Sequence, residues 1–499
     1  MGLTNKRQKQ TRKNTITKKT SLKGGLIYGK PGSYGITLGD PPLPSKDIRN
    51  TYSKMSGKLT IQGKSKRGKS VAVNSSNPNS NSTANPNNAE LDENSYVSKI
   101  FFDENNIRMA LKAIDYIKSA ISGSNNQTVE QLFGAYLLLP RRWQNGKYYI
   151  SIDRIKYMKS KFQSDEYWKF NNPKSPGEGG PQIELREKFK GARKQIQYLK
   201  AVGGDLDGVR ANSIESFKDF MMKYQNIVKG IDLLHSHGLV HHDIKLGNML
   251  SVQMGAETKY LISDLDTIRQ FDYFTNENYN KLQQNDDSFD FDRLFLNWAY
   301  EYFPTYITLL APVLLSEDDV SHNSAYADNL LSIGIVDEWN VAAASSCQIW
   351  FNELYKKLHK ILPADKNSTL SDIRLIFLHK YGNDKLNGDF KAKDERQYKL
   401  NNMMRTNRYI SDRLNNSGLT LIEMRNILLK YVDIYGATIS ILRKLFEFTK
   451  DFAGPYTPEI IDYLINIIQV VKSILTAEYF GNKLYEQTFS NLYEQILPK

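Results

Sequence analysis

The feature that most constrains the fold is a polar stretch, residues 241–250, which lies between a helical pattern and two short apolar runs. Upstream, apolar residues recur every three or four positions over residues 217–235, which predicts an amphipathic helix. Gly238 follows where a left-handed residue would end that helix. Downstream, residues 249–252 and 260–263 indicate two strands joined by a turn. A helix, a loop and a hairpin are therefore expected to form one packed unit.

Four polar side chains on this unit have the chemistry for transfer of a phosphoryl group to a hydroxyl. Asp243 can orient the hydroxyl and accept its proton, and Lys245 can neutralise charge on the moving group. Asn248 and Asp264 can hold the metal ions that bridge the phosphates. The alternative is a surface loop that carries these residue types by chance. The agreement of spacing and flanks disfavours that alternative.

This order of helix, loop, hairpin and aspartate strongly resembles the catalytic core of the eukaryotic-type protein kinases, over residues 217–268. The resemblance implies an α+β fold with two lobes, a small β-rich lobe and a large, mainly helical lobe. The small lobe would take residues 24–204, with a flexible insertion at about 45–95. The large lobe would take residues 205–499, with a helical insertion at about 311–428. It also implies ATP and Mg²⁺ as cofactors.

A glycine-rich stretch near the N-terminus contains Gly32, Ser33, Tyr34 and Gly35. Glycines allow backbone amides to approach phosphates closely. In the family this loop is written G-x-G-x-x-G-x-V and covers the phosphates of ATP. Gly32 and Gly35 match its last two glycines, whereas Lys30 stands at the first. The spelling Gly-Ser-Tyr-Gly, with the Pro-rich stretch and Val-Ser-Lys strand that follow, resembles kinase-like proteins of large DNA viruses.

Lys99 lies in a β-prone run, residues 96–102, before a predicted helix. The resemblance implies that this lysine binds the α- and β-phosphates of ATP. The alternative is an edge-strand lysine that faces water. The family's helix carries a glutamate that pairs with the lysine, but no glutamate lies in the middle of the helix here. Asp115 is the nearest suitable acid and Glu104 comes early, so the acidic partner of Lys99 is left open.

The resemblance also has departures that bear on regulation. His242 stands where the family has an arginine that binds a phosphate on the activation segment, so activation by such a phosphorylation is not expected. Leu265 and Asp266 replace the Phe-Gly of the metal-binding triplet. Leu265 can fill the apolar slot of the phenylalanine, whereas Asp266 replaces a glycine that helps the segment to flip.

The family's central large-lobe helix begins with a buried aspartate that supports the catalytic loop. Two stretches compete for this role, one at Asp290 and one at Asp433. Asp433 is favoured, because an Asp-x-Tyr opening is followed by apolar residues at helical spacing. Residues 196–206 resemble the last small-lobe strand and the hinge, and residues 460–475 predict an amphipathic helix.

Three functions compete on these residues. The first is a serine/threonine protein kinase that phosphorylates a protein hydroxyl, with Asp243 as base. The second is a pseudokinase that serves as an ATP-binding or scaffolding module, which Asp266 and the missing helix glutamate favour. The third is a small-molecule phosphotransferase, a class whose loop lacks the lysine, so Lys245 counts against it.

The charge distribution and the cysteine content limit the binding partners and the cellular compartment that we expect for the protein. The net charge of +13 is concentrated in residues 1–70, which hold 17 lysines and arginines against two aspartates. The basic tail, residues 1–23, is expected to be disordered and could bind nucleic acid or another polyanion, the alternative being a solvated tail with no partner. The one cysteine fits a reducing compartment. No apolar run predicts a membrane span or a secretory signal. An intracellular location is expected, the host cytoplasm or the virion if the protein is viral.

Overall fold

The computed structural model describes residues 35–38, 96–101, 104–121, 128–139, 142–148, 193–199, 201–275, 301–304, 338–381 and 418–498. Its short strands and many helices form an α+β structure, as predicted. The chain folds into two compact units. One unit comprises Met1–Glu104 and Pro140–Lys200, and the other comprises Asn105–Leu139 and Ala201–Lys499.

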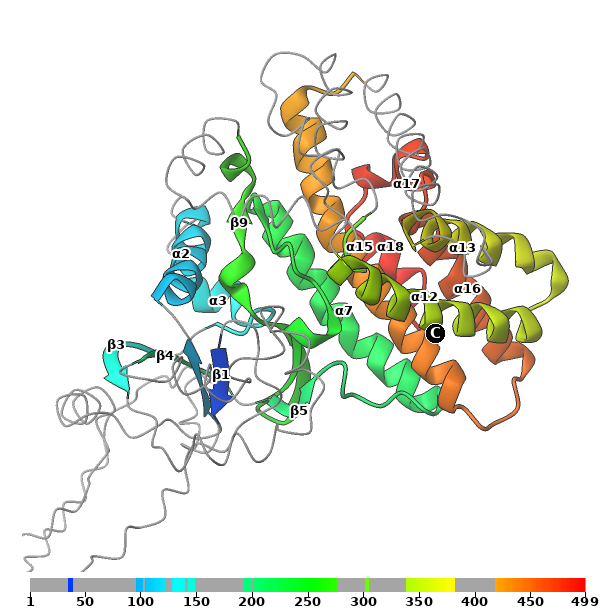
Figure 1. Ribbon diagram of the computed structural model, residues 1–499, viewed down its shortest axis with the longest axis horizontal. Helices are drawn as coiled ribbons and strands as arrows, with labels where there is room; N and C mark the ends of the chain where they lie inside the picture. Colours follow the sequence, from blue (N-terminus) through cyan, green and yellow to red (C-terminus); the bar gives the residue numbers. More distant parts are fainter. Residues whose placement is uncertain are drawn as a thin grey trace, which may run out of the picture. The chain divides into compact units, whose positions relative to one another are not determined.

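The first unit contains an antiparallel four-stranded sheet in the order β1-β2-β4-β3 (Figure 1). The strands are β1 (Gly35–Leu38), β2 (Tyr96–Phe101), β3 (Arg142–Tyr148) and β4 (Arg193–Leu199). Lys99 lies in β2, and its backbone is paired with Thr37 of β1 and Ile196 of β4. The predicted strand is therefore confirmed, and it lies in the middle of the sheet rather than at an edge.

In the second unit, α7 (Ile214–Ser236) leads into the polar loop. Ser213 and Ser216 form a capping box that satisfies backbone amides of its first turn. Its buried apolar face has the predicted spacing and consists of Phe217, Phe220, Met221, Tyr224, Ile227, Val228, Ile231 and Leu234. Gly238 has φ +68° and ends the helix in the left-handed conformation. The predicted helix is confirmed.

A hairpin follows the loop, as predicted. Its strands are β7 (Met249–Met254) and β8 (Glu257–Ile262), joined by a turn in which Gly255 has φ +64°. β5 (Ala201–Asp205) pairs with β7 and completes a three-stranded sheet. β6 (Leu239–Val240) pairs instead with β9 (Arg269–Gln270). The stretch over residues 196–206, predicted as a strand followed by the hinge, thus forms two strands, β4 in one unit and β5 in the other.

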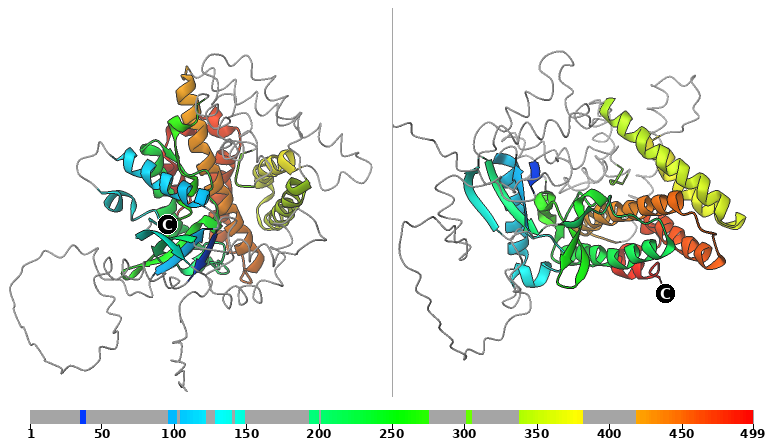
Figure 2. Two further views of the ribbon diagram at one scale, coloured as in Figure 1. Left: turned by 60° about the vertical axis from the view of Figure 1, so that its left-hand side comes forward. Right: turned by 90° about the horizontal axis from the view of Figure 1, so that it is seen from below.

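The longest of the described helices, α15 (Leu421–Asp451), crosses the second unit and packs against α7, α12 (Glu338–Ile361) and α16 (Pro458–Leu475) (Figure 2). Thr420 and Glu423 cap its start. The prediction that this helix begins at Asp433 is wrong, because the apolar helical pattern already runs through Leu428 and Leu429 and the capping residues stand before it. α15 therefore begins within the stretch predicted as an insertion.

Smaller helices surround this core. They are α2 (Glu104–Ala120), α3 (Val129–Phe133), α13 (Asn367–Tyr381), α17 (Glu478–Gly481) and α18 (Phe489–Glu494). α13 packs on α12 and α16, and α18 packs on α7, where Asp232 accepts hydrogen bonds from the amides of Phe489 and Ser490. The predicted helix over residues 460–475 is confirmed as α16. Among the described residues, none of the helices combines the length and apolar character that a membrane span requires.

Candidate active site

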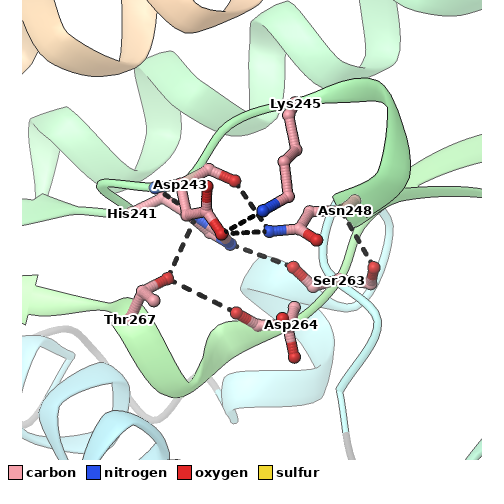
Figure 3. Close-up of polar contacts among 7 residues, drawn as sticks. All are labelled: His241, Asp243, Lys245, Asn248, Ser263, Asp264 and Thr267. Carbon is pink, nitrogen blue, oxygen red and sulfur yellow. Dashed lines mark hydrogen bonds and ion pairs between the residues drawn. The ribbon is translucent and has the colours of Figure 1, made fainter. Parts of the chain in front are cut away.

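In the polar loop, residues 241–250, two predicted site residues donate hydrogen bonds to one carboxylate oxygen of a third, Asp243 (Figure 3). Asp243 Oδ2 accepts a hydrogen bond from Lys245 Nζ at 2.7 Å and another from Asn248 Nδ2 at 2.8 Å. Asn248 Nδ2 also donates to the backbone carbonyl of Asp243 at 2.9 Å. The carboxylate is partly accessible, with 20% of the Asp243 side chain exposed. These bonds fix the Asp243 rotamer and leave the carboxylate within reach of a ligand.

The charge of Lys245 is secured by two carboxylates. Burial alone would lower its pKa, but Asp243 beside it and Asp264 more than offset the burial, so that the pKa is raised. Lys245 is therefore a cation at neutral pH. A fixed positive charge next to the candidate base is what stabilisation of a transferring phosphoryl group needs.

Asp264 is tied to the same loop through its neighbour Ser263. The amide of Ser263 donates to the carbonyl of Asn248 at 2.8 Å, and its hydroxyl donates to the same oxygen at 2.9 Å. Asp264 itself has φ 59° and ψ 51°, a left-handed conformation that is costly for a residue other than glycine. Such strain persists where the surrounding structure fixes the backbone, and it often accompanies function.

The oxygen donors of the site suit a metal ion that arrives with a phosphate ligand. Because Asn248 turns its amide nitrogen to Asp243, its amide oxygen is the atom left for a cation. Within the described ranges, no cluster of three or more His, Cys, Asp or Glu residues could hold an ion by itself. Mg²⁺ is commonly held by one or two protein ligands plus phosphates and water. Asn248 and Asp264 fit that coordination.

His241 links the loop to the Asp264 segment, a role that the sequence did not reveal. Its Nε2 lies 3.0 Å from the carbonyl of Ser263, and its Nδ1 lies 3.3 Å from the amide of Asp243. Because a carbonyl only accepts, Nε2 carries the proton and Nδ1 accepts from the amide. The fully buried ring thus joins the backbone at Asp243 to the residue before Asp264.

Asp433 supports the loop from α15, as predicted. Its Oδ2 accepts from the amide of His241 and its Oδ1 from the amide of His242, both at 2.8 Å. His235 Nε2 lies 3.2 Å from Oδ2. Burial alone would raise the pKa of Asp433, but the His235 hydrogen bond and the contacts with His241 lower it. The competing candidate, Asp290, lies outside the described residues.

His242 has the environment of a core residue. It is fully buried with φ 68°, and its ring centroid lies 4.8 Å from that of Phe274. Burial lowers its pKa to about 3, so the ring is neutral at physiological pH. A neutral, buried imidazole does not provide the cation with which an arginine would bind a phosphate.

The segment after Asp264 is fixed by contacts on several sides. Leu265 is buried, as predicted for the apolar slot of the triplet. Arg269 Nη1 donates at 2.8 Å to the carbonyls of both Asp266 and Ile268. Gln270 Nε2 donates at 3.1 Å to Ser119 Oγ of α2. These contacts hold the backbone around Asp266 in one arrangement.

Glu301 is a second anchor that the sequence did not reveal. Its carboxylate accepts a hydrogen bond from Trp350 Nε1 of α12 at 3.1 Å and lies 3.4 Å from Arg443 Nη2 of α15. The Arg443 guanidinium stacks over the Trp350 ring at 4.7 Å. Close by, a Cβ added to Gly436 of α15 would lie 3.3 Å from the carbonyl of Tyr302. Residues 301–304 are therefore held against the central helix.

The remaining predicted site residues are placed only in part. Gly35 begins β1, and Lys99 lies in β2. Gly32, Ser33 and Tyr34 lie outside the described residues.

The side chain of Asp115 on α2 is 74% exposed and lies 3.6 Å from Lys118 Nζ. The acidic partner of Lys99 stays open.

No protein-family model matches this chain. A stretch of 84 residues is 31% identical to the serine/threonine-protein kinase H1 homolog of Danio rerio. The stretch represents 16% of this chain and 20% of that protein, so the chain covers about a fifth of the relative's length. This similarity supports a kinase-like relationship for part of the chain.

Proposed function

We propose that the protein is an ATP-dependent serine/threonine protein kinase. The observation that carries the proposal is the shared oxygen of Asp243, which binds Lys245 and Asn248 while Asp264 is tied to the same loop through Ser263. This arrangement supplies a base, a cation and metal ligands within one hydrogen-bonded frame. The partial similarity to a serine/threonine protein kinase gives independent support.

In the proposed reaction, the oxygen of a serine or threonine hydroxyl bonds to the γ-phosphorus of ATP while Asp243 accepts the proton of that hydroxyl. The bond between that phosphorus and the β,γ-bridging oxygen breaks, and ADP leaves. Lys245 neutralises charge on the transferring group. Asn248 and Asp264 would hold Mg²⁺, which when bound offsets the phosphate charge. The proposal also assigns the ATP phosphates to Gly32, Ser33, Tyr34, Gly35 and Lys99, as the resemblance implies.

A pseudokinase is the second candidate, and the segment around Asp266 favours it. Arg269 donates hydrogen bonds to the backbone carbonyls of Asp266, where the family has a flexible glycine, and of Ile268. These bonds would hold the segment in one state. Such a protein would bind ATP and catalyse little or no transfer. A thermal-shift titration with Mg-ATP distinguishes the candidates when it is combined with a transfer assay.

The transfer assay uses γ-labelled ATP, Mg²⁺ and a generic basic protein as substrate. Wild-type protein is expected to label the substrate on serine or threonine, and the Asp243→Asn variant is not. Absence of transfer by the wild type, together with stabilisation by Mg-ATP, would support the pseudokinase. Equal labelling by both proteins would show that Asp243 is not the base.

A further inference from the structure

A cavity of about 460 Å³ lies where α7 meets the β7–β8 hairpin. None of the four candidate active-site residues on the loop and after β8 lines it. Its lining comes from the α7 stretch 222–229 and from β8 residues 257–259. We call this cavity the α7 groove. It belongs entirely to the second unit and is separate from the site described above.

The floor of the α7 groove is formed in advance. Asn226 Nδ2 donates to the carbonyls of Ala135 and Tyr260, both at 2.8 Å, so both of its amide hydrogens are used. Next to it, Gly230 lets α7 approach Tyr136 and Ile262, to which an added Cβ would lie 3.0 and 3.1 Å away. A groove held in this way loses little conformational entropy when a ligand binds.

Positive charge predominates around the α7 groove. Lys223, Lys229 and Lys259 line it, against the single carboxylate of Glu257. Lys223 pairs with Asp219 at 2.6 Å, and Lys259 lies 3.7 Å from Glu257. Lys229 is exposed, and no ion pair to it occurs among the residues that the structure describes. A ligand with carboxylates would therefore complement this rim.

An apolar side chain lies among these lysines. Met222 is 49% exposed, and Ile422 is the other large apolar residue exposed in the described part of the chain. Methionine adapts its shape to different apolar partners and is common at surfaces that bind peptides. An inorganic polyphosphate has no apolar part to place on Met222, whereas an acidic peptide can cover Met222 with an apolar side chain and place carboxylates beside the lysines.

We propose that the α7 groove binds an acidic segment of a partner protein. One large apolar side chain of the segment covers Met222, and its carboxylates lie beside Lys229 and Lys259. Lys223 keeps its partner Asp219 and contributes less. The proposal does not depend on the proposed phosphoryl transfer, because it concerns binding at a surface that the active site does not share.

The test measures fluorescence anisotropy of a labelled peptide, in which a central leucine is flanked by aspartates and glutamates, against the full chain. Reversing two groove charges, Lys229→Glu with Lys259→Glu, is expected to weaken binding at least tenfold. The matched control reverses two exposed lysines outside the groove, Lys356→Glu with Lys450→Glu, and should weaken binding less than threefold. All the proteins compared carry the same basic tail, so its attraction for the peptide cancels in the ratios of their affinities.

A second pair of measurements separates docking from diffuse attraction. Met222→Ser changes no charge and is expected to weaken the leucine peptide threefold or more. It should leave unchanged a peptide that carries serine in place of leucine. Equal losses from the groove and control charge reversals would overturn the proposal, as would a leucine peptide that is insensitive to Met222. So would a groove reversal that weakens a single-stranded oligonucleotide but not the peptide.

Discussion

At the scale of single residues, the proposed chemistry depends on Asp243 Oδ2 and its two donors. Lys245 is the donor that carries charge, and the carboxylates of Asp243 and Asp264 keep it protonated. Asn248 fixes the rotamer of the carboxylate without adding charge. The two donors should therefore differ in what their loss does to the reaction.

Replacing Lys245 with methionine keeps most of the length of the side chain and removes its charge. We expect kcat to fall about 10²- to 10³-fold, the usual cost of losing one group that stabilises transition-state charge. The affinity for ATP should change much less. Steady-state transfer kinetics at saturating ATP measure the effect. A variant with unchanged kcat would show that Lys245 does not act on the transferring group.

His242 predicts a pH dependence of stability whose sign follows from its burial. Its pKa falls from 6.5 to about 3 on folding, so the unfolded chain binds a proton that the folded protein does not. Protonation thus favours unfolding. The contribution of a neutral His242 to the free energy of unfolding is fully present above pH 6.5 and is lost progressively toward pH 3. Between pH 7 and 5 the loss should be about 2 kcal/mol.

The variant His242→Asn tests this, because asparagine does not titrate and tolerates the left-handed backbone at this position. Urea unfolding at several pH values should show a flatter profile for His242→Asn than for the wild type. His359→Asn, at an exposed position on α12, serves as the control and should keep the wild-type slope. A wild-type slope in His242→Asn would contradict the burial argument.

At the scale of elements, α15 and the polar loop lie in close contact at Gly436. A Cβ there would lie 2.5 Å from the carbonyl of Ile244, the residue after Asp243. Glycine is required because backbone atoms on both sides leave no room. The same helix presents Asp433 to the amides of His241 and His242, so the loop is held at two points.

Gly436→Ala should therefore push α15 away from the loop. We expect a loss of about 1–3 kcal/mol in the free energy of unfolding, typical of overpacking, and slower transfer. The matched control is Gly247→Ala in the loop itself, where an added Cβ would meet no atom within 4 Å. Chemical denaturation of both variants measures the difference. Equal stability of the two variants would contradict this account of the contact.

Local elements were predictable from the sequence, whereas long-range anchors were predictable only where the resemblance supplied them, as it did for Asp433. The face of α7 and the β7–β8 hairpin follow from apolar spacing and glycine turns, which act within a few residues. The Asp-x-Tyr pattern predicts the wrong start for α15 because it lies inside the helix, whereas the cap at Thr420 marks the beginning of the helix. The links from His241 to Ser263 and from Glu301 to Trp350 and Arg443 join residues 22 to 142 positions apart, which no local pattern indicates.

At the scale of the whole molecule, the positive charge belongs to residues 1–70, while the rest of the chain is close to neutral. The basic tail, residues 1–23, contains eight lysines and arginines and few apolar residues. We propose that it binds polyanions without sequence specificity. Such binding weakens as salt rises, with a slope set by the number of phosphates neutralised.

Deleting residues 1–23 should lower the affinity for a single-stranded oligonucleotide and flatten its dependence on salt. Anisotropy titrations between about 50 and 200 mM salt give both quantities. The groove variant Lys229→Glu with Lys259→Glu should keep the wild-type slope, since it leaves the tail intact. A deletion that left the slope unchanged would remove the tail as a polyanion site.

The central claim is that Asp243 is the base of a phosphoryl transfer, and single-turnover kinetics with pre-bound Mg-ATP test it most directly. We expect Asp243→Asn to slow the chemical step about 10²- to 10⁴-fold, the usual contribution of a general base, while ATP affinity stays near the wild-type value. Transfer by Asp243→Asn at the wild-type rate would contradict the account, because the hydrogen-bonded frame would then surround a residue with no part in the chemistry.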